Sequence, residues 1–267
     1  MSGKASLYSH STEDREHLTI TSNRSRLSVM KGPSSSMINS DRPDDPALWA
    51  INRFVEELEQ VRKSLGLNTV NILGQSWGSM LAFDYVLERK PTGVRSLVFS
   101  GPCLSMSRWM TDQQAYLAAM PETIRDVIYE KEASGDTNSQ EYREAMMYYY
   151  RRHLCRLDSW PDCLNRTFEK MGTSVYEHMV GPSEFTITGT LGDYERTDRV
   201  KEITQPILFT CGRYDEATPE TTARYHRMHT HPGSEFVILE NASHEHHLEK
   251  PEEYLHIVRD FLRKQES

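Results

Sequence analysis

From residue 47 onward, short apolar runs alternate with stretches in which apolar residues recur every three to four positions. The runs lie at 69–73, 94–101, 206–212 and 235–240. Each is short and rich in β-branched and apolar residues, a pattern typical of strands that are buried on both faces. Strands that alternate with helices predict a parallel sheet with helices on both of its faces.

The intervening stretches carry the period and the end signals of helices. Residues 47–65 are predicted to form an amphipathic helix that ends before Gly66, with an expected buried face of Phe54, Leu58, Val61 and Leu65. A second helix is expected between the first strand and Pro91, and another over residues 251–264.

Two segments break the alternation. Residues 104–185 have a helical composition without a convincing strand and are too long for a loop, so we expect a helical cap between two core segments, 41–103 and 186–267. Residues 1–40 are rich in Ser, Thr, Asn and Arg and have no sustained period, which predicts a segment without regular structure. The early strands of the fold would then be missing, and the strand at 69–73 would be an exposed edge.

The composition restricts the possible functions. Of the 267 residues, 37% are hydrophobic and 26% are charged, and the net charge of -8 disfavours a nucleic-acid-binding surface, which needs basic side chains. No apolar run is long enough to span a membrane, and the N-terminal residues lack the apolar segment of a secretory signal. The cysteines are widely scattered, at Cys103, Cys155, Cys163 and Cys211. We therefore expect a cytoplasmic protein with reduced thiols.

The stretch GQSWG, residues 74–78, has the form of a nucleophile turn between a strand and a helix. Gly74 and Gly78 would let the chain pass close to itself, so that Ser76 would lie in a strained turn with its hydroxyl exposed above the sheet. The helix N-terminus that follows would favour the negative charge of a transition state.

Two later residues complete a catalytic triad. Asp215 follows the run at 206–212, and His244 follows the run at 235–240. The chain order Ser, Asp, His is that of the α/β-hydrolase fold. Taken alone, Asp215 would equally suit the N-cap of the following helix.

The stretch HEHH at residues 244–247 invites a metal-site interpretation, but it lacks the spacing of a zinc-binding helix. We expect no metal and no other cofactor. His246 and His247 are expected to be exposed loop residues.

From about Asp41 to its C-terminus, the chain resembles the proline iminopeptidase (prolyl aminopeptidase) family of the α/β-hydrolase superfamily, which includes the tricorn-interacting aminopeptidases. The resemblance rests on SDRPDDPALW, FVEELEQVRKSLGL, ILGQSWGSMLAFDYV, YYRRHLCRLDSWP, GPSEFTITGTL, GRYDEATP and NASHEHHLEKPEEY. It implies a helical cap and a serine exopeptidase that removes an N-terminal residue, often proline, from short peptides.

The resemblance also implies roles beside the triad. The backbone N–H of Trp77 would donate to the oxyanion. Glu184 in GPSEFT and Glu216, directly after Asp215, would hold the free amino terminus of the substrate. Because an ammonium group needs carboxylates, this pair would exclude substrates with a blocked amine.

The first forty residues depart from the family, since they lack its HGGPG loop, which donates the second oxyanion N–H, and its YDQLGCGRS stretch. A shifted reading frame, which joins the third base of each codon to the first two of the next, offers an explanation. In that frame HSTEDREHLTIT (10–21) permits LHGGPG and, two positions later, HDY, while MKGPSSSMINSD (30–41) permits EG and then YDQ. We hypothesise that residues from about 9 to 40 are an out-of-frame reading of the family's oxyanion segment. A genuine extension with another purpose is the alternative.

Two other functions stay open. An esterase, amidase or lactonase would use the same triad without the glutamate pair. A chain that truly lacks the oxyanion loop would be catalytically impaired, because the loss of one donor typically costs about 10²–10³ in turnover. Such a product would act as a binding protein or not at all. The sequence does not indicate an oligomeric state.

The frame hypothesis predicts the nucleotide sequence of the transcript. We expect one shifted base or a misplaced splice junction between codons 8 and 42, and its correction should restore HGGPG and YDQ. Sequencing the transcript checks this. A transcript that encodes these residues as written would refute the hypothesis.

Overall fold

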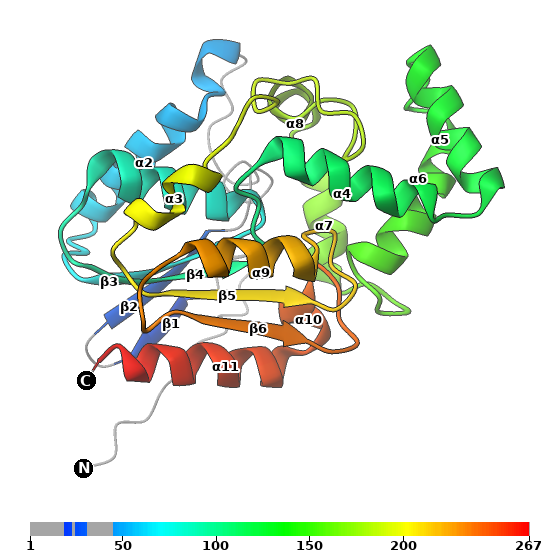
Figure 1. Ribbon diagram of the computed structural model, residues 1–267. Helices are drawn as coiled ribbons and strands as arrows, with labels where there is room; N and C mark the ends of the chain where they lie inside the picture. The colour runs from blue at the N-terminus through cyan, green and yellow to red at the C-terminus, as the bar shows by residue number, and fades with distance from the viewer. Residues whose placement is uncertain (1–18, 23–24, 31–44, 267) are drawn as a thin grey trace.

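The computed structural model describes residues 19–22, 25–30 and 45–266, which form a six-stranded sheet with helices on both faces (Figure 1). In order across the sheet, the strands are β1 Thr19–Ser22, β2 Ser25–Met30, β3 Val70–Gln75, β4 Val94–Ser100, β5 Ile207–Gly212 and β6 Glu235–Leu239. β1 is antiparallel to β2, and every later pair of neighbours is parallel. The predicted parallel sheet is therefore confirmed.

The four apolar runs form β3 to β6, and their side chains alternate between two cores. Phe99 and Phe209 belong to the larger core, whereas their neighbours Val98 and Leu208 belong to the core on the opposite face. Successive side chains of a strand point to opposite faces of the sheet. A run without polar alternation therefore supplies apolar side chains to both cores.

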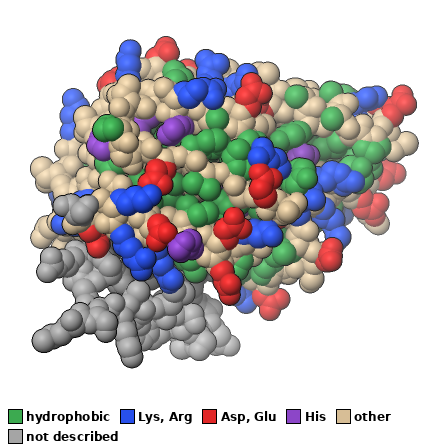
Figure 2. Space-filling view, turned by 60° about the horizontal axis from the view of Figure 1, so that its bottom comes forward, with side chains coloured by type: hydrophobic (Ala, Val, Ile, Leu, Met, Phe, Trp, Pro, Cys, Tyr) green, Lys and Arg blue, Asp and Glu red, His purple; other side chains and the backbone are tan. Residues whose placement is uncertain are grey.

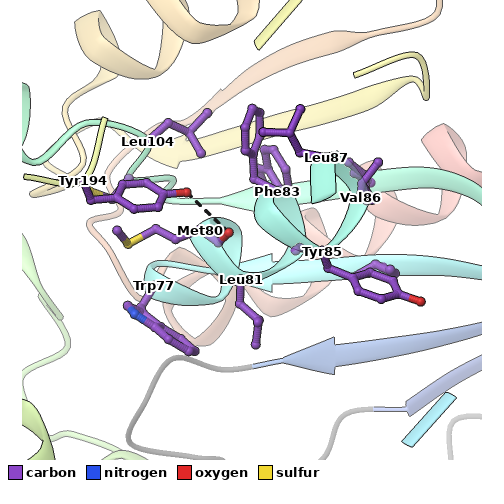
Figure 3. Packing of buried hydrophobic residues seen from close by; sticks show 14 of the residues in the cluster. Trp77, Met80, Leu81, Phe83, Tyr85, Val86, Leu87, Leu104 and Tyr194 are labelled. Atoms are coloured by element: carbon purple, nitrogen blue, oxygen red, sulfur yellow. Dashed lines mark hydrogen bonds between the residues drawn. The ribbon is translucent and has the colours of Figure 1, made fainter. Parts of the chain in front are cut away.

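Helices cover the two faces of the sheet. The helices α2 Ile51–Ser64, α3 Trp77–Arg89 and α9 Pro219–Met228 lie on one face, and α11 Pro251–Lys264 lies on the other (Figure 1). Buried side chains leave α3 in several directions, with Phe83 and Leu87 on one side and Trp77 and Leu81 on another (Figure 3). A helix that is apolar all round is buried on every side. Consequently α3 and the turn that precedes it are held rigidly.

Between β4 and β5 the chain forms a helical insertion. Its helices are α4 Met106–Ala118, α5 Glu122–Ser134, α6 Gln140–His153, α7 Asp162–Lys170 and α8 Thr173–Met179. They lie beyond the ends toward which β5 and β6 point (Figure 1). The short elements are η1 Pro46–Leu48, η2 Thr197–Glu202 and α10 His246–Glu249. Between β4 and β5, within the described residues, the chain forms helices and no strand.

The prediction for the N-terminal segment was wrong in part. Two strands, β1 and β2, occur within residues 1–40, and β2 pairs with β3 from Arg26–Val70 to Met30–Gly74. β3 is therefore an interior strand and not an exposed edge. The polar sequence conceals these strands, because backbone hydrogen bonding to β3 does not depend on side-chain type. Most of the two stretches in the frame hypothesis, 10–21 and 30–41, lies outside the described residues.

The predicted buried face of α2 was also wrong in part. Val61 and Leu65 are 50% and 62% exposed, while Arg62 is buried. The Arg62 guanidinium donates to the carbonyls of Leu67, Asn68 and Thr92 and to the Tyr85 hydroxyl. A buried cation with this many acceptors is stable in the interior, and it turns the C-terminal half of α2 away from its apolar side.

Charges are mixed on the molecular surface. On the face shown in Figure 2, Lys and Arg side chains are interspersed with Asp and Glu side chains. Within the described ranges, no helix combines the length and the apolar character needed to cross a membrane. All four cysteines are free thiols.

The sheet core generates a stability prediction. Phe209 is fully buried, and its ring packs edge-on against Phe99 at 5.8 Å between centroids. Phe209→Ala should lower the free energy of unfolding by about 3–5 kcal/mol, because it removes buried apolar surface and leaves a cavity. Urea denaturation measures this. The exposed Val61→Ala should change the same quantity by less than about 0.5 kcal/mol, and an equal loss in both variants would contradict the core assignment.

Candidate active site

Ser76 lies in a strained turn between β3 and α3. Its backbone has φ 54° and ψ -124°, a conformation that non-glycine residues rarely adopt. The turn needs Gly74, because a Cβ there would lie 2.2 Å from the carbonyl oxygen of Gly78. The Ser76 N–H donates to Ser100 O at 2.9 Å, and the Ser79 hydroxyl donates to Ser76 O at 2.6 Å. The predicted turn geometry is present.

The helix α3 begins immediately after this serine, at Trp77. The first N–H groups of a helix have no acceptor within the helix, and the helix dipole makes this end electropositive. The backbone N–H of Trp77 is therefore available to an oxyanion bound at Ser76.

Asp215 and His244 form a buried pair at the carboxyl ends of β5 and β6. His244 Nδ1 lies 2.7 Å from Asp215 Oδ1, and the side chains are 3% and 0% exposed. Asp215 also accepts the N–H groups of Gly212, at 3.1 Å, and Ala217, at 2.8 Å. These hydrogen bonds satisfy the carboxylate oxygens of Asp215 and fix its orientation toward the imidazole of His244.

Charge stabilises the ionised form of this carboxylate. Burial alone would raise the pKa of Asp215, but the charges and hydrogen bonds of His244 and His246 outweigh burial and lower the pKa to about 2. Asp215 is therefore ionised throughout the physiological pH range.

His246 contradicts the prediction that it is an exposed loop residue. It is fully buried, with Nε2 2.8 Å from Ser100 Oγ and 3.1 Å from Thr210 Oγ1, and Nδ1 3.1 Å from Ser243 O. The same Nδ1 lies 3.5 Å from Asp215 Oδ2. His247 is half-buried and also not an exposed residue. No local sequence pattern indicates this packing, because it arises where α10 folds back onto the sheet.

Glu184 and Glu216 face one cavity together with Ser76, Trp77 and His244. Glu216 is buried, and its Oε1 lies 3.5 Å from His244 Nε2. Glu184 accepts a hydrogen bond from the Tyr176 hydroxyl at 2.6 Å. Burial raises the pKa of both glutamates, although the Tyr176 hydrogen bond opposes the rise at Glu184 and the charge of His244 opposes it at Glu216. All six residues selected from the sequence thus lie at one site.

The loop that carries Glu184 is fixed by a residue that the sequence analysis missed. Glu132 on α5 accepts hydrogen bonds from the Ser183 and Thr186 hydroxyls, and from the Tyr142 hydroxyl at 2.9 Å. Ser183 and Thr186 flank Glu184 on both sides, so Glu132 anchors the loop on each side of that residue. No local motif marks Glu132, since its two partners in that loop lie 51 and 54 residues away in the chain.

The helical insertion also fixes the loop around Glu216. Gln113 on α4 donates to the Glu216 carbonyl at 2.9 Å, and its amide oxygen accepts the Tyr149 hydroxyl. The Tyr116 hydroxyl donates to the Asp215 carbonyl at 3.0 Å. The site is therefore built from both the sheet and the insertion.

Gly101 provides a test of this geometry. It has φ +56°, and a Cβ there would lie 2.7 Å from His244 Nδ1 and 3.3 Å from Asp215 Oδ2. Gly101→Ala should displace the imidazole and lower the rate of Ser76 labelling by a fluorophosphonate on the order of 10²-fold.

Gly135→Ala is the matched control for this variant. Gly135 has a similar φ of +76°, but nothing lies within 4 Å of its added Cβ. It imposes the same backbone strain without touching the site, and its labelling rate should match that of the parent chain. Equal rates in the two variants would show that the contact with His244 is immaterial.

The chain matches known families over most of its length. The family model of the alpha/beta hydrolase fold matches residues 31–251. The proline iminopeptidase of Heyndrickxia coagulans is 44% identical over 224 residues, which cover 84% of this chain and 77% of that protein. The proline iminopeptidase of Saccharolobus solfataricus is 35% identical over 225 residues, which cover 84% and 72% of the two chains.

The fold agrees with this sequence similarity. The crystal structure of the proline iminopeptidase of Mycobacterium smegmatis superposes with a TM-score of 0.79 at 30% identity, over 90% of this chain and 89% of that one. The strand–turn–helix at Ser76 and the strands β3 to β6 lie within the residues that the family model matches. The chain therefore has the predicted α/β-hydrolase fold and belongs to the proline iminopeptidase family.

Proposed function

We propose that this chain is a serine aminopeptidase that releases an N-terminal residue, proline in particular, from short peptides with a free amino terminus. The observation that carries the proposal is the pair of carboxylates, Glu184 and Glu216, in the cavity that also holds Ser76 and His244. The names of the relatives support the same substrate class.

The proposed reaction proceeds through an acyl-enzyme. Ser76 Oγ attacks the first peptide carbonyl as His244 Nε2 takes its proton, and Asp215 holds the imidazolium. The Trp77 N–H donates to the oxyanion. The C–N bond breaks as His244 returns the proton to the leaving amine, and water then hydrolyses the ester in the same way.

The two glutamates would select the substrate. A free ammonium group placed between them gains charge-assisted hydrogen bonds, whereas an acylated amine leaves both groups without a partner. Helices α4 to α8 would act as the cap, with boundaries at residues 104 and 185. An esterase on the same fold has no need of this pair, which favours the aminopeptidase.

Glu184→Ala tests the anchoring role. Removing one partner of a buried charged pair typically costs about 2–5 kcal/mol, so kcat/KM for proline p-nitroanilide should fall on the order of 10²-fold or more. The exposed Glu177→Ala on the neighbouring α8 should leave it unchanged. Hydrolysis of free and N-acetylated proline p-nitroanilide at equal rates by the parent chain would rule out the aminopeptidase.

A further inference from the structure

The nitrogen of His244 that must accept the serine proton faces a carboxylate. His244 Nδ1 lies 2.7 Å from Asp215 Oδ1, and Nε2 lies 3.5 Å from Glu216 Oε1. The imidazole is therefore held between two acids inside the protein, with both of its nitrogens directed at oxygen. To act as the base toward Ser76, His244 Nε2 would have to be unprotonated and accessible to the serine hydroxyl.

The groups around His244 are predominantly acidic. The side chain is buried, and the backbone N–H donates to His153 O at 3.0 Å. Trp109 packs edge-on against the ring at 6.4 Å between centroids. The titratable groups of the surrounding elements include Asp215, Glu216, Glu184, Glu245, His153, His246, Cys103, Tyr116, Tyr149 and Tyr176. None of these surrounding groups is a lysine or an arginine.

These neighbours change the titration of the base. Burial alone would lower the pKa of His244, but Asp215 and Glu216 outweigh it and raise the pKa to about 10. Burial also raises the pKa of Glu216, so the carboxyl group that faces His244 likewise tends to keep a proton. The contact at 3.5 Å and the raised pKa of His244 thus favour a protonated imidazole beside Glu216 at neutral pH. While Nε2 carries a proton, it cannot accept the proton of Ser76.

We propose that the ammonium group of the substrate switches on the base by taking Glu216 away from His244. This inference rests on the proposed aminopeptidase function and gives Glu216 two roles: it holds the amino terminus, and it locks the base while the site is empty. When the ammonium binds between Glu184 and Glu216, its positive charge pairs with Oε1 and repels an imidazolium. The proton on Nε2 leaves to solvent, and neutral Nε2 then takes the proton of Ser76.

The switch adds discrimination at the chemical step. A substrate without a free amine would meet a protonated base even after it had entered the cavity. Such a substrate is rejected through kcat as well as through binding, which binding contacts alone would not achieve.

The isosteric Glu216→Gln separates the two roles. It removes the charge but keeps the shape, and the Gln113 bond is to the backbone carbonyl of residue 216. We expect kcat/KM for proline p-nitroanilide to fall, because the variant loses one of the two carboxylates that would hold the substrate's amino terminus. For p-nitrophenyl acetate, which has no amine, kcat/KM at pH 7 should instead rise about 10–100-fold, since loss of a nearby negative charge lowers the pKa of the base by one or more units.

The pH dependence makes the test specific. For an ester, kcat/KM reports the free enzyme, and activity appears as pH rises through the pKa of His244. In the parent chain this midpoint should lie near 10, and in Glu216→Gln it should lie at least one unit lower. The exposed Glu220→Gln on α9 should leave the ester profile unchanged.

The outcomes are distinguishable from a failure of the proposed function. If the parent chain prefers free amines but Glu216→Gln shows the parent ester profile, the switch is refuted and the aminopeptidase stands. If the Glu216→Gln variant fails to fold, the pH profiles of the parent chain test the switch instead. Its kcat for proline p-nitroanilide should reach half its maximum at a lower pH than its ester kcat/KM, and coincident profiles would overturn the switch.

Discussion

The whole site depends on one close approach of the backbone, between Gly74 and Gly78. It allows β3 to turn directly into α3, and it places Ser76 in a conformation that costs on the order of 1–3 kcal/mol. The turn persists because its surroundings are rigid: β3 pairs on both sides, and α3 is buried all round. The strained backbone of Ser76 is thus held in place by a strand that is paired on both sides and by a buried helix.

The second constraint is the burial of negative charge. Asp215 and Glu216 are adjacent in the chain and both buried, and Glu184 comes to the same cavity from the insertion. Uncompensated charges would be costly in such a place. Asp215 is compensated by His244, His246 and backbone N–H groups, whereas the carboxylate of Glu216 meets, among the described residues, His244 Nε2 at 3.5 Å and the Tyr149 hydroxyl at 3.4 Å. In the proposed function, the ammonium group of the substrate supplies the positive charge that these carboxylates lack.

The sequence predicted the elements whose signal is local. The apolar runs, the turn at Ser76 and the positions of Asp215 and His244 after their strands follow from side-chain patterns over a few residues. The errors concern contacts between distant segments. Arg62 is buried because the carbonyl of Thr92 and the hydroxyl of Tyr85, 30 and 23 residues away, join the nearby carbonyls of Leu67 and Asn68 around it. His246 is buried because α10 folds against β4 and β5. No short stretch of sequence contains that information.

The last residues of α6 restrict how substrates reach the site. His153 O accepts the N–H groups of both Glu216 and His244, and Leu154 O accepts that of Glu245 at 2.8 Å. A rigid outward swing of the entire insertion would break these three interior bonds at about 1–3 kcal/mol each. The C-terminal end of α6 therefore stays attached to the loops that carry Glu216 and His244. The facing wall of the cavity comes from α7 and α8, whose Leu164, Phe168 and Tyr176 line it, and these two helices take no part in the three bonds. A change in the size of the cavity can therefore come from α7 and α8 while the end of α6 stays in place.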